Sequence, residues 1–394
     1  MKDNSKIISF NEIENNSTDI PSEILNIENR KRTNLFAWNG QFSPQFVEAM
    51  LSKYGKSGEF VLDPFAGSGT VLIEAARKKI NAVGVELNPS AFYMAKTYEF
   101  CNLHEDERKK YLNMLKIAIE KSNDNNLLST FKKLLFDNNE YLKTMVSCLV
   151  ILMDFYKYPP NKERANTIFK KIEKIILELP YTTTSVKSFC GDIRTIFNST
   201  QNSTFDLVLT SPPYINVFNY HQNYRKSVEF LGFDVLKIAR KEFGSNRRNR
   251  SNRLLTVVEY AIDMALAIDS ILKTVKEKGR IIFVVGRVSN VLGYSFQNSR
   301  IIYEIFEYIF EQPFLIKQER HFTNRFGQTI YEDILHFAKA DYSADTSKII
   351  NGARLIAKKI LEEKRNEANK NNGKLNEAIE LIPVIDMSEE DNYA

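Results

Sequence analysis

Hydrophobic and polar positions follow the periods of regular secondary structure along most of the chain. Apolar residues recur at helical spacing from Gln45 to Tyr54, directly after a serine and a proline that are typical of a helix start. Short apolar runs at 60–62 and 82–85 flank a glycine-rich turn and the helical stretch 71–79. This order predicts a strand–helix–strand unit of a doubly wound α/β fold, in which the two strands are parallel.

The pattern further along the chain predicts the rest of the sheet and a helical insertion. Helical period and Lys-rich composition extend over 91–179, so we expect a helical insertion at 97–187. Strand-like runs then occur at 206–209 and 280–285, on the two sides of a long helix over 256–275. A further helix and two β-rich runs follow, at 300–310, 315–321 and 330–338. The two runs predict an antiparallel hairpin that closes the sheet.

The two ends of the chain are more polar than its middle. Residues 1–30 are rich in Asn, Glu and Ser, which predicts a flexible N-terminal arm. Residues 341–394 predict a charged helix over 353–368 and then a flexible tail. The main domain is therefore expected to span 31–340.

Composition is that of a folded protein, with 43% hydrophobic and 26% charged residues. The net charge of +5 suits a polyanionic partner without requiring one. The three cysteines have neither an even count nor the spacing of metal ligands, so we expect no metal and no disulfide framework. The sequence shows no signal peptide and no membrane-spanning run, which favours a cytoplasmic protein with no membrane partner.

The glycine-rich turn after the first strand is the first candidate site. Gly67 and Gly69 lack side chains, so a cofactor can approach the backbone closely. Glu86 ends the next strand, about 20 residues later, where a carboxylate in this topology accepts hydrogen bonds from both ribose hydroxyls. Neither a lysine after the second glycine nor a third glycine is present, which disfavours triphosphates and dinucleotides. The turn therefore indicates a nucleoside cofactor, with a plain strand-to-helix turn as the alternative.

Residues 210–214 read Thr-Ser-Pro-Pro-Tyr and form the second candidate site, at the carboxyl end of the strand 206–209. The amino group of a nucleic acid base is a poor nucleophile because its lone pair is delocalised into the ring, so a site that modifies it must accept its hydrogens. Ser211 Oγ and the carbonyl of Pro212 offer two acceptors, and consecutive prolines restrict the backbone. Tyr214 can stack on a base that has left the duplex. An ordinary proline turn is the alternative.

Together these segments make the chain, from about Asn34 to Lys339, resemble the amino-methyltransferases of DNA. That family methylates N4 of cytosine or N6 of adenine. In that family, segments like 63–70 bind the methionine moiety of the cofactor, segments like 85–89 bind its ribose and segments like 191–194 contact its adenine. The stretch 35–44 resembles the segment that covers the cofactor, and 211–214 resembles the catalytic motif. The resemblance implies a Rossmann-like doubly wound methyltransferase sheet and S-adenosyl-L-methionine as cofactor.

The resemblance also implies roles for individual residues. The residues expected to bind the cofactor are Phe42, Ser43, Asp63, Phe65, Gly67, Gly69, Thr70, Glu86, Asn88 and Asp192. The residues expected to be catalytic are Ser211, Pro212, Pro213 and Tyr214. Serine at the first motif position is commoner among N4-cytosine members of the family, whereas aspartate predominates among N6-adenine members, so Ser211 favours cytosine.

A basic segment after the catalytic motif predicts the contact with double-stranded DNA. Its arginines and lysines can neutralise phosphates, and arginine and asparagine can read base edges. We expect a DNA-recognition loop at 215–255, in which the DNA-binding residues are Arg247, Arg248, Arg250 and Arg253. A solvated linker is the alternative for this loop, and the helical insertion is an alternative seat of target recognition.

The sequence therefore predicts a site-specific methyltransferase that modifies N4 of a flipped-out cytosine in DNA. We expect it to belong to a restriction-modification system, with a cognate endonuclease that acts on the same site. The alternatives are an N6-adenine enzyme, an RNA amino-methyltransferase and a catalytically silent DNA-binding subunit.

Overall fold

The computed structural model describes residues 9–16, 19–27, 31–197, 203–215, 219–244, 251–323, 327–367 and 373–389. Its contacts divide the chain into two compact units. The glycine-turn unit comprises Arg30–Gly191 and Asn219–Ala239. The SPPY unit, which contains the Ser-Pro-Pro-Tyr segment, comprises Met1–Asn29, Asp192–Phe218 and Arg240–Ala394.

The glycine-turn unit contains three parallel strands in the order β3-β2-β1. They are β1 (Phe60–Asp63), β2 (Asn81–Glu86) and β3 (Val186–Cys190). The crossover from β1 to β2 is the helix α3 (Thr70–Arg77), whose apolar face is buried. The helix predicted to precede β1 is α2 (Pro44–Tyr54). The predicted strand–helix–strand unit is thus present with the expected parallel pairing.

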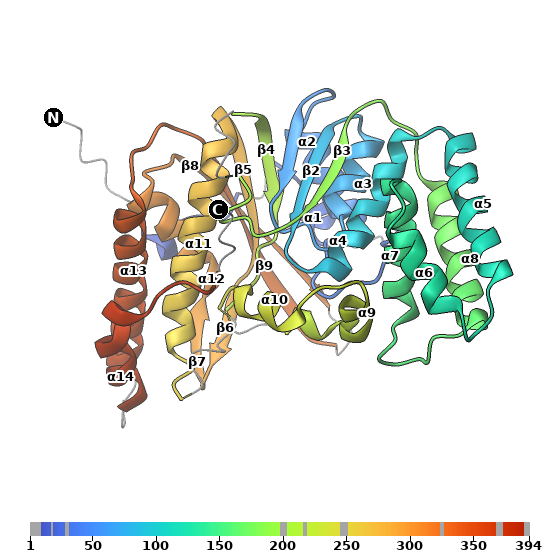
Figure 1. The fold of residues 1–394 in the computed structure, drawn as a ribbon. Helices are drawn as coiled ribbons and strands as arrows, with labels where there is room; N and C mark the ends of the chain where they lie inside the picture. The colour runs from blue at the N-terminus through green and yellow to red at the C-terminus, as the bar shows by residue number, and fades with distance from the viewer. Residues whose placement is uncertain are drawn as a thin grey trace. The chain divides into compact units, whose positions relative to one another are not determined.

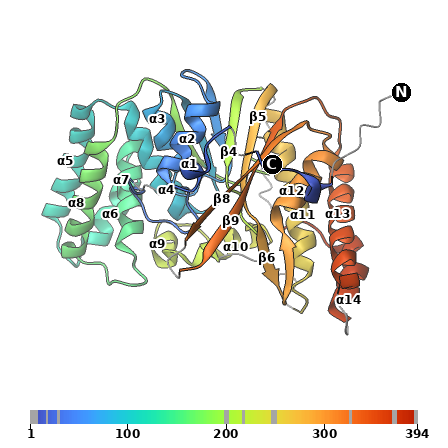
Figure 2. The same ribbon diagram turned by 180° about the vertical axis from the view of Figure 1, so that it is seen from behind.

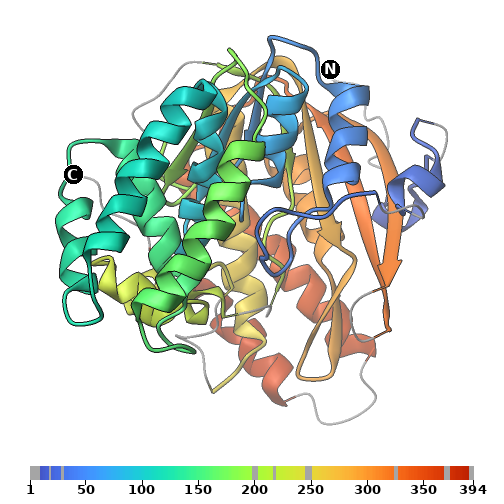
Figure 3. The ribbon, with the colours of Figure 1, turned by 90° about the vertical axis from the view of Figure 1, so that its right-hand side faces the viewer.

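Between β2 and β3 the chain is helical. The elements are α4 (Pro89–Lys96), the 3-10 turn η2 (Thr97–Asn102), α5 (Glu105–Lys121), α6 (Leu127–Leu135), α7 (Glu140–Met153) and α8 (Lys162–Glu178). The second half of α7 is apolar on all sides and is buried against α4, α6 and α8. Figure 1 shows α5 and α8 side by side, and Figure 3 shows the same helices, teal to green, from another side.

The strand β3 lies at the end of the segment that we expected to be a helical insertion. Val186 and Ser188 are buried, whereas Lys187 and Phe189 are exposed, which is the alternation of a half-buried strand. The exposed Phe189 makes this alternation hard to recognise from hydrophobicity alone. The expected insertion therefore includes the first residues of a strand.

The SPPY unit contains four strands in the order β4-β5-β9-β8. They are β4 (Phe205–Thr210), β5 (Val275–Gly286), β8 (Phe314–Thr323) and β9 (Thr329–Ala338). β4 and β5 are parallel, whereas β9 pairs antiparallel with β5 and with β8. Figure 2 shows β8 and β9 as long neighbouring strands. The predicted α/β class, with parallel pairing and a closing antiparallel hairpin, is confirmed.

Three of the helical elements described in the SPPY unit follow its last strand, β9. From Leu255 onward, the described helical elements are α11 (Leu255–Thr274), α12 (Asn298–Glu304), the π-helical turn Ile305–Ile309, α13 (Thr346–Glu367), α14 (Gly373–Leu381) and a 3-10 turn (Ile382–Val384). α13 buries one apolar stripe against α11, and Figure 1 shows α11 beside α13, with α14 below α13. A short hairpin of β6 (Val288–Val291) and β7 (Tyr294–Gln297), which the pattern analysis did not identify, follows β5.

Part of the segment expected to be a flexible N-terminal arm is packed within the SPPY unit. It contains a 3-10 turn (Phe10–Glu12) and the short helix α1 (Ser22–Leu25). The ring of Phe10 lies 5.5 Å from that of Tyr303, centroid to centroid, and Leu25 is buried. These apolar residues are too widely spaced to give a periodic signal, so composition alone suggested an arm.

The segment 215–255, expected to be a DNA-recognition loop, contains short helices where the structure describes it. They are η3 (Tyr220–Gln222), α9 (Arg225–Phe230) and α10 (Val235–Lys241). Val228 of α9 is buried, and so are Val235 and Ala239, which lie four residues apart on α10, so each helix has apolar residues to bury. Among all described residues, no helix is both long enough and apolar enough to span a membrane.

Candidate functional site

The glycine turn begins where β1 ends. Asp63 is buried, and its Oδ1 accepts a hydrogen bond of 3.2 Å from the amide of Phe65, which turns the chain out of the strand. Gly69 precedes α3 with a φ of +86°, a left-handed conformation that favours glycine. A Cβ at Gly69 would lie 2.9 Å from Cα of Ala95, so the space also excludes a side chain.

Glu86, at the end of β2, holds this turn in place. Its Oε2 accepts a hydrogen bond of 2.8 Å from the amide of Gly67, and its Oε1 accepts one of 2.8 Å from the amide of Asn88. The side chain of Asn88 in turn caps α4, because its Oδ1 accepts a hydrogen bond of 2.9 Å from the amide of Ser90. A carboxylate has about four acceptor positions, so Glu86 can serve the turn and further donors together.

The stretch expected to cover the cofactor is hydrogen-bonded to the glycine turn. Ser68 Oγ donates to Gln41 Oε1 at 2.7 Å, and Thr70 Oγ1 donates to Asn34 Oδ1 at 3.1 Å. Asn34 also donates to the carbonyl of Phe42 at 2.8 Å, which fixes the bend between them. The structure therefore brings 34–42 and 63–70 together, and the role of 35–44 as a cover over the cofactor stays a prediction.

Two aromatic side chains lie at this turn that the sequence analysis did not select. A Cβ on Gly67 would lie 3.4 Å from the indole of Trp38, so the absence of a side chain there leaves room beside the ring. The indole stacks on Tyr220, with centroids 6.0 Å apart and an angle of 17° between the planes. Trp38 is the one tryptophan of the sequence, which was a signal that could have been used.

Phe42 and Ser43 serve the packing and start of α2. Phe42 is buried, with its ring centroid 5.5 Å from that of Phe46. Ser43 is the residue before the first turn of α2, and its hydroxyl lies 3.3 Å from Gln45 Oε1. These two residues help to pack and start α2. A direct contact of either residue with the cofactor stays a prediction.

The residues at this turn fit a nucleoside cofactor. The carboxylate of Glu86 is an acceptor for hydroxyl groups at the end of a parallel strand. The backbone around Gly67 lacks a Cβ at the point where Trp38 approaches, and the turn leads into the first residue of a helix. The carboxylate of Glu86 suits the ribose hydroxyls, the backbone at Gly67 suits a polar chain, and the ring of Trp38 suits a base.

Asp192, the expected adenine contact, belongs to a buried ionic cluster in the SPPY unit. The guanidinium of Arg194 contacts both carboxylate oxygens of Asp192 and lies 2.7 Å from Asp263 Oδ1. Burial raises the pKa of Asp263 to about 6, against the opposing effect of the Arg194 charge. Arg194 also donates to Ser388 Oγ at 2.8 Å and to the carbonyl of Glu389 at 2.8 Å. The cluster therefore ties the loop of Asp192 to the C-terminal segment.

The Ser-Pro-Pro-Tyr segment follows β4 and is fixed by hydrogen bonds inside the SPPY unit. Tyr260 of α11 donates to the carbonyl of Pro213 at 3.1 Å. The amide of Ile215 donates to Asn298 Oδ1 at 3.3 Å, and Asn298 donates to the carbonyl of Gly286 at 2.8 Å. In the described part of the chain, by contrast, no group donates to the carbonyl of Pro212.

The side chain of Tyr214 is half-buried and packs on β5. A Cβ on Gly286 would lie 2.5 Å from Cε2 of Tyr214, so only glycine allows the ring to lie there. The Tyr214 hydroxyl donates to Glu332 Oε1 at 3.2 Å. Burial raises the pKa of Tyr214 well above its ordinary value, and the carboxylate of Glu332 adds to this rise. The phenol therefore keeps its proton at neutral pH.

Of the four arginines expected to bind DNA, one lies in the described part of the chain. Arg253 is exposed, just before the start of α11. Arg247, Arg248 and Arg250 lie outside the described residues. Their contact with DNA stays a prediction.

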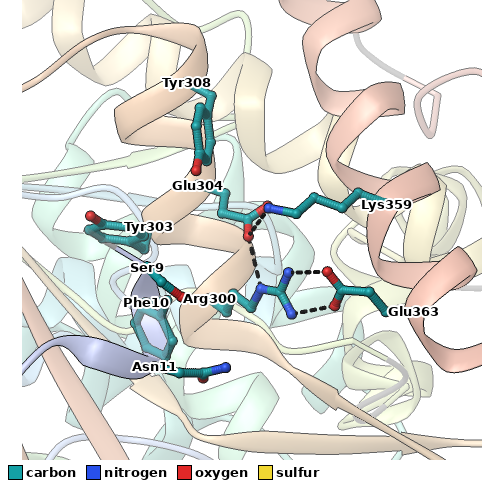
Figure 4. Close-up of a pocket in the computed structure, with 9 residues that line it drawn as sticks. All are labelled: Ser9, Phe10, Asn11, Arg300, Tyr303, Glu304, Tyr308, Lys359 and Glu363. Carbon is teal, nitrogen blue, oxygen red and sulfur yellow. Dashed lines mark hydrogen bonds and ion pairs between the residues drawn. The ribbon is translucent and has the colours of Figure 1, made fainter. Parts of the chain in front are cut away.

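A separate pocket of about 360 Å³ lies within the SPPY unit, and the sequence analysis did not predict it (Figure 4). Its charged residues neutralise one another: Arg300 pairs with Glu363 and Glu304, and Lys359 also pairs with Glu304. The N-terminal Phe10 and the helix α12 contribute to its walls. Because these charged groups pair with one another, we interpret the pocket as a packing gap between helices and not as a binding site.

These features define a class of protein. An α/β fold with a glycine turn after β1, an acidic residue ending β2 and a Ser-Pro-Pro-Tyr segment after β4 resembles the pattern of methyltransferases for amino groups. The chemistry of the two segments matches a nucleoside cofactor and an amino acceptor, respectively.

Comparisons with known proteins agree with this class. The DNA methylase family matches residues 2–97. Type II methyltransferase M.BsoBI from Geobacillus stearothermophilus is 23% identical over 54% of this chain and 55% of its own length. Type II methyltransferase M.MjaII from Methanocaldococcus jannaschii is 21% identical over 75% of this chain and 78% of its own length. The chain thus spans about half the length of the first relative and about three quarters of the second.

One solved structure, of an S-adenosylmethionine-dependent methyltransferase from Methanosarcina mazei, aligns with 74% of this chain and 96% of its own, with a TM-score of 0.36 and 10% identity. The family match and the curated relatives agree with the resemblance of this chain to the S-adenosylmethionine-dependent DNA amino-methyltransferases. The cofactor of the family is S-adenosyl-L-methionine, as expected from the sequence.

Proposed function

We propose that the chain transfers a methyl group to the exocyclic N4 of a flipped-out cytosine at a specific site in double-stranded DNA. The observation that carries this proposal is the Ser-Pro-Pro-Tyr segment at the carboxyl end of β4. Serine at its first position is typical of N4-cytosine enzymes in the family that the sequence resembles. The Type II methyltransferases among the relatives support DNA as the substrate.

The acceptors of the segment suit an amino group. The carbonyl of Pro213 already accepts from Tyr260, whereas the carbonyl of Pro212 has no donor within the described residues. Pro212 and Ser211 therefore offer the two acceptors for the two hydrogens of the amino group, which localises the nitrogen lone pair. The ring of Tyr214, held on Gly286, offers an aromatic surface near these acceptors.

We assign the cofactor to the glycine turn. When bound, S-adenosyl-L-methionine supplies a methyl group activated by a positively charged sulfur. Glu86 then binds the ribose, and the turn of Asp63, Phe65, Gly67, Gly69 and Thr70 binds the methionine moiety. Phe42, Ser43 and Asn88 support the turn through the contacts described above, and Asp192 contacts the adenine.

The partners follow from the same proposal. The arginines 247, 248, 250 and 253 contact DNA phosphates, and the double helix releases the target base into the site. The Type II relatives suggest a restriction-modification system, so we propose a cognate endonuclease that cuts the same unmethylated site in the cytoplasm.

Mass spectrometry of nucleosides tests the reaction. Purified protein is incubated with unmethylated plasmid DNA and S-adenosyl-L-methionine, and the DNA is digested to nucleosides. We expect N4-methylcytosine. N6-methyladenine as the sole product would overturn the choice of base, and methylation of RNA in preference to DNA would overturn the substrate.

A serine variant tests the assigned chemistry. Ser211→Ala should nearly abolish product while the affinity for S-adenosyl-L-methionine, measured by calorimetry, stays the same. Ser52→Ala is a matched control, because Ser52 is an exposed serine whose hydroxyl bonds only to the backbone of its own helix. Full activity of Ser211→Ala would show that the mechanism is wrong even if the product is right.

A further inference from the structure

Four polar side chains and one glycine form a connected row in the SPPY unit. Ser211 Oγ lies 3.4 Å from Tyr214 Oη, and Tyr214 Oη lies 3.2 Å from Glu332 Oε1. The guanidinium Nε of Arg320 lies 2.5 Å from Glu332 Oε2. The row therefore connects the first residue of the catalytic segment with an ion pair on two strands.

The sheet fixes the far end of this row. Glu332 of β9 is directly opposite Gly286 of β5 on one side and directly opposite Arg320 of β8 on the other. The ring of Tyr214 packs on Gly286. Because Gly286 and Glu332 are paired residues of β5 and β9, the strand pairing places the ring and the carboxylate next to each other. Arg320 and Glu332 are both buried, which holds their ion pair in a fixed geometry.

The chemistry of the groups decides the direction of each hydrogen bond. Glu332, as the carboxylate of an ion pair, accepts hydrogen bonds and donates none. Tyr214 has a single hydroxyl proton, which it keeps because its pKa is raised, and the carboxylate takes that hydrogen bond. The oxygen of Tyr214 is then an acceptor in its contact with Ser211. The hydroxyl of Ser211 must therefore donate to Tyr214.

We propose that Glu332 and Arg320 are positioning residues that orient the hydroxyl proton of Ser211 away from the substrate. This inference rests on the proposed function, in which Ser211 receives a hydrogen of the target amino group. With its own proton given to Tyr214, Ser211 presents only lone pairs, as a carboxylate would in its place. A neutral serine thereby acts as a pure acceptor, and the charge that determines this lies two hydrogen bonds away.

Glu332→Gln tests the direction of the row with an almost unchanged shape. Arg320 would hold the amide oxygen of the glutamine, so the amide nitrogen would face Tyr214 and donate to it. Tyr214 would then donate to Ser211 and occupy a lone pair that the substrate needs. We expect the single-turnover rate to fall about ten- to a hundredfold, the effect of one hydrogen bond to a strong acceptor. The affinities for S-adenosyl-L-methionine and for DNA should stay within a factor of two or so.

A double-mutant cycle separates orientation from stability. Tyr214→Phe keeps the ring and breaks the row, so it should lower the rate by a similar factor. Glu332→Gln in the Tyr214→Phe background should then have no further effect on the rate, because the row is already broken. A structural role of the Glu332–Arg320 pair would instead lower the rate in both backgrounds.

Glu319→Gln is the matched control. Glu319 lies on β8 next to Arg320 and pairs with Arg287 and Lys317, but it does not contact Tyr214 in the described structure. Its rate should equal that of the wild type. A wild-type rate for Glu332→Gln, or rate effects that multiply in the double variant, would overturn this inference and leave the proposed function intact. Failure of the wild type to methylate DNA would overturn the proposed function itself.

Discussion

At the scale of single residues, the glycine turn depends on carboxylates that serve the backbone. Glu86 accepts from two backbone amides, that of Gly67 within the turn and that of Asn88 just after β2. Asp63 does the same for the amide of Phe65. Because a carboxylate is an acceptor only, it can hold such a turn and still present lone pairs to hydroxyl groups.

Glu86→Ala should weaken the binding of S-adenosyl-L-methionine about ten- to a hundredfold, since hydrogen bonds to a charged acceptor contribute about 1.5–3 kcal/mol. Calorimetry measures the affinity. Glu59→Ala is the control, because Glu59 also accepts from a backbone amide in a turn, that of Lys56, but lies just before β1, at the opposite end of the strand from the glycine turn. Equal affinities of Glu86→Ala and the wild type would refute the assignment of Glu86 as the residue that binds the ribose.

Glu74 gives the stability of the chain a dependence on pH. It is buried on α3, and burial raises its pKa to about 7, although Arg32 at 2.6 Å opposes the rise. In the unfolded chain this carboxyl loses its proton near pH 4.5. The folded state binds the proton more tightly, so the stabilisation is present at low pH and is lost as the pH rises toward 7.

The wild type should therefore lose about 2 kcal/mol more free energy of unfolding than Glu74→Gln between pH 5 and pH 8. Urea denaturation at the two pH values measures this difference, and other titrating groups cancel in the comparison. The same pH dependence in both proteins would show that Glu74 does not titrate in this range.

At the scale of elements, the C-terminal segment is a structural part of the SPPY unit. Arg194, which follows β3 closely in sequence, donates to Ser388 and Glu389, and Arg240 pairs with Glu389 at 2.8 Å. Asp263 of α11 accepts from the amide of Ser388 at 3.0 Å. The segment thus supplies acceptors to a buried arginine and a donor to a buried carboxylate.

Removal of residues 386–394 should destabilise the protein by about 1–3 kcal/mol, because donors of a buried guanidinium lose their partners. Thermal denaturation measures the loss. Ser388→Ala, which keeps the backbone carbonyls, should have the smaller effect of the two. A truncated protein with the melting temperature of the full chain would show that the segment contributes nothing to the cluster.

At the scale of the whole molecule, the excess of basic residues matters most where it is concentrated. The net charge is +5, and seven lysines and arginines fall within 237–253. A concentrated basic segment releases counterions from DNA, whereas dispersed lysines on helices remain solvated.

Replacement of Arg247, Arg248 and Arg250 by alanine should flatten the salt dependence of DNA binding by about one unit of log–log slope per lost phosphate contact. Fluorescence anisotropy at several salt concentrations measures the slope. The control replaces Lys170, Lys171 and Lys174, which are exposed on α8, and changes the net charge equally. A flatter slope in the control alone would move the DNA contact to the helical region.

The sequence by itself determined the strand–helix–strand unit, the glycine turn with Glu86 and the Ser-Pro-Pro-Tyr segment. These features depend on neighbours in the chain, because apolar periods, turn glycines and prolines act within a few residues. The strand β3 and the hairpin β6–β7 escaped prediction because their short alternation is mixed with exposed apolar residues such as Phe189 and Val288.

Only the tertiary structure decided which distant residues support the candidate site. Tyr214 and Glu332 are 118 positions apart, and Arg194 and Ser388 are 194 positions apart. Neither pair leaves a local pattern, because a contact across a sheet or with a chain end depends on how strands pair and helices pack. The sequence therefore determined the reacting groups, and the pairing of β5, β9 and β8 decided what orients them, since only paired strands place Gly286, Glu332 and Arg320 in one row.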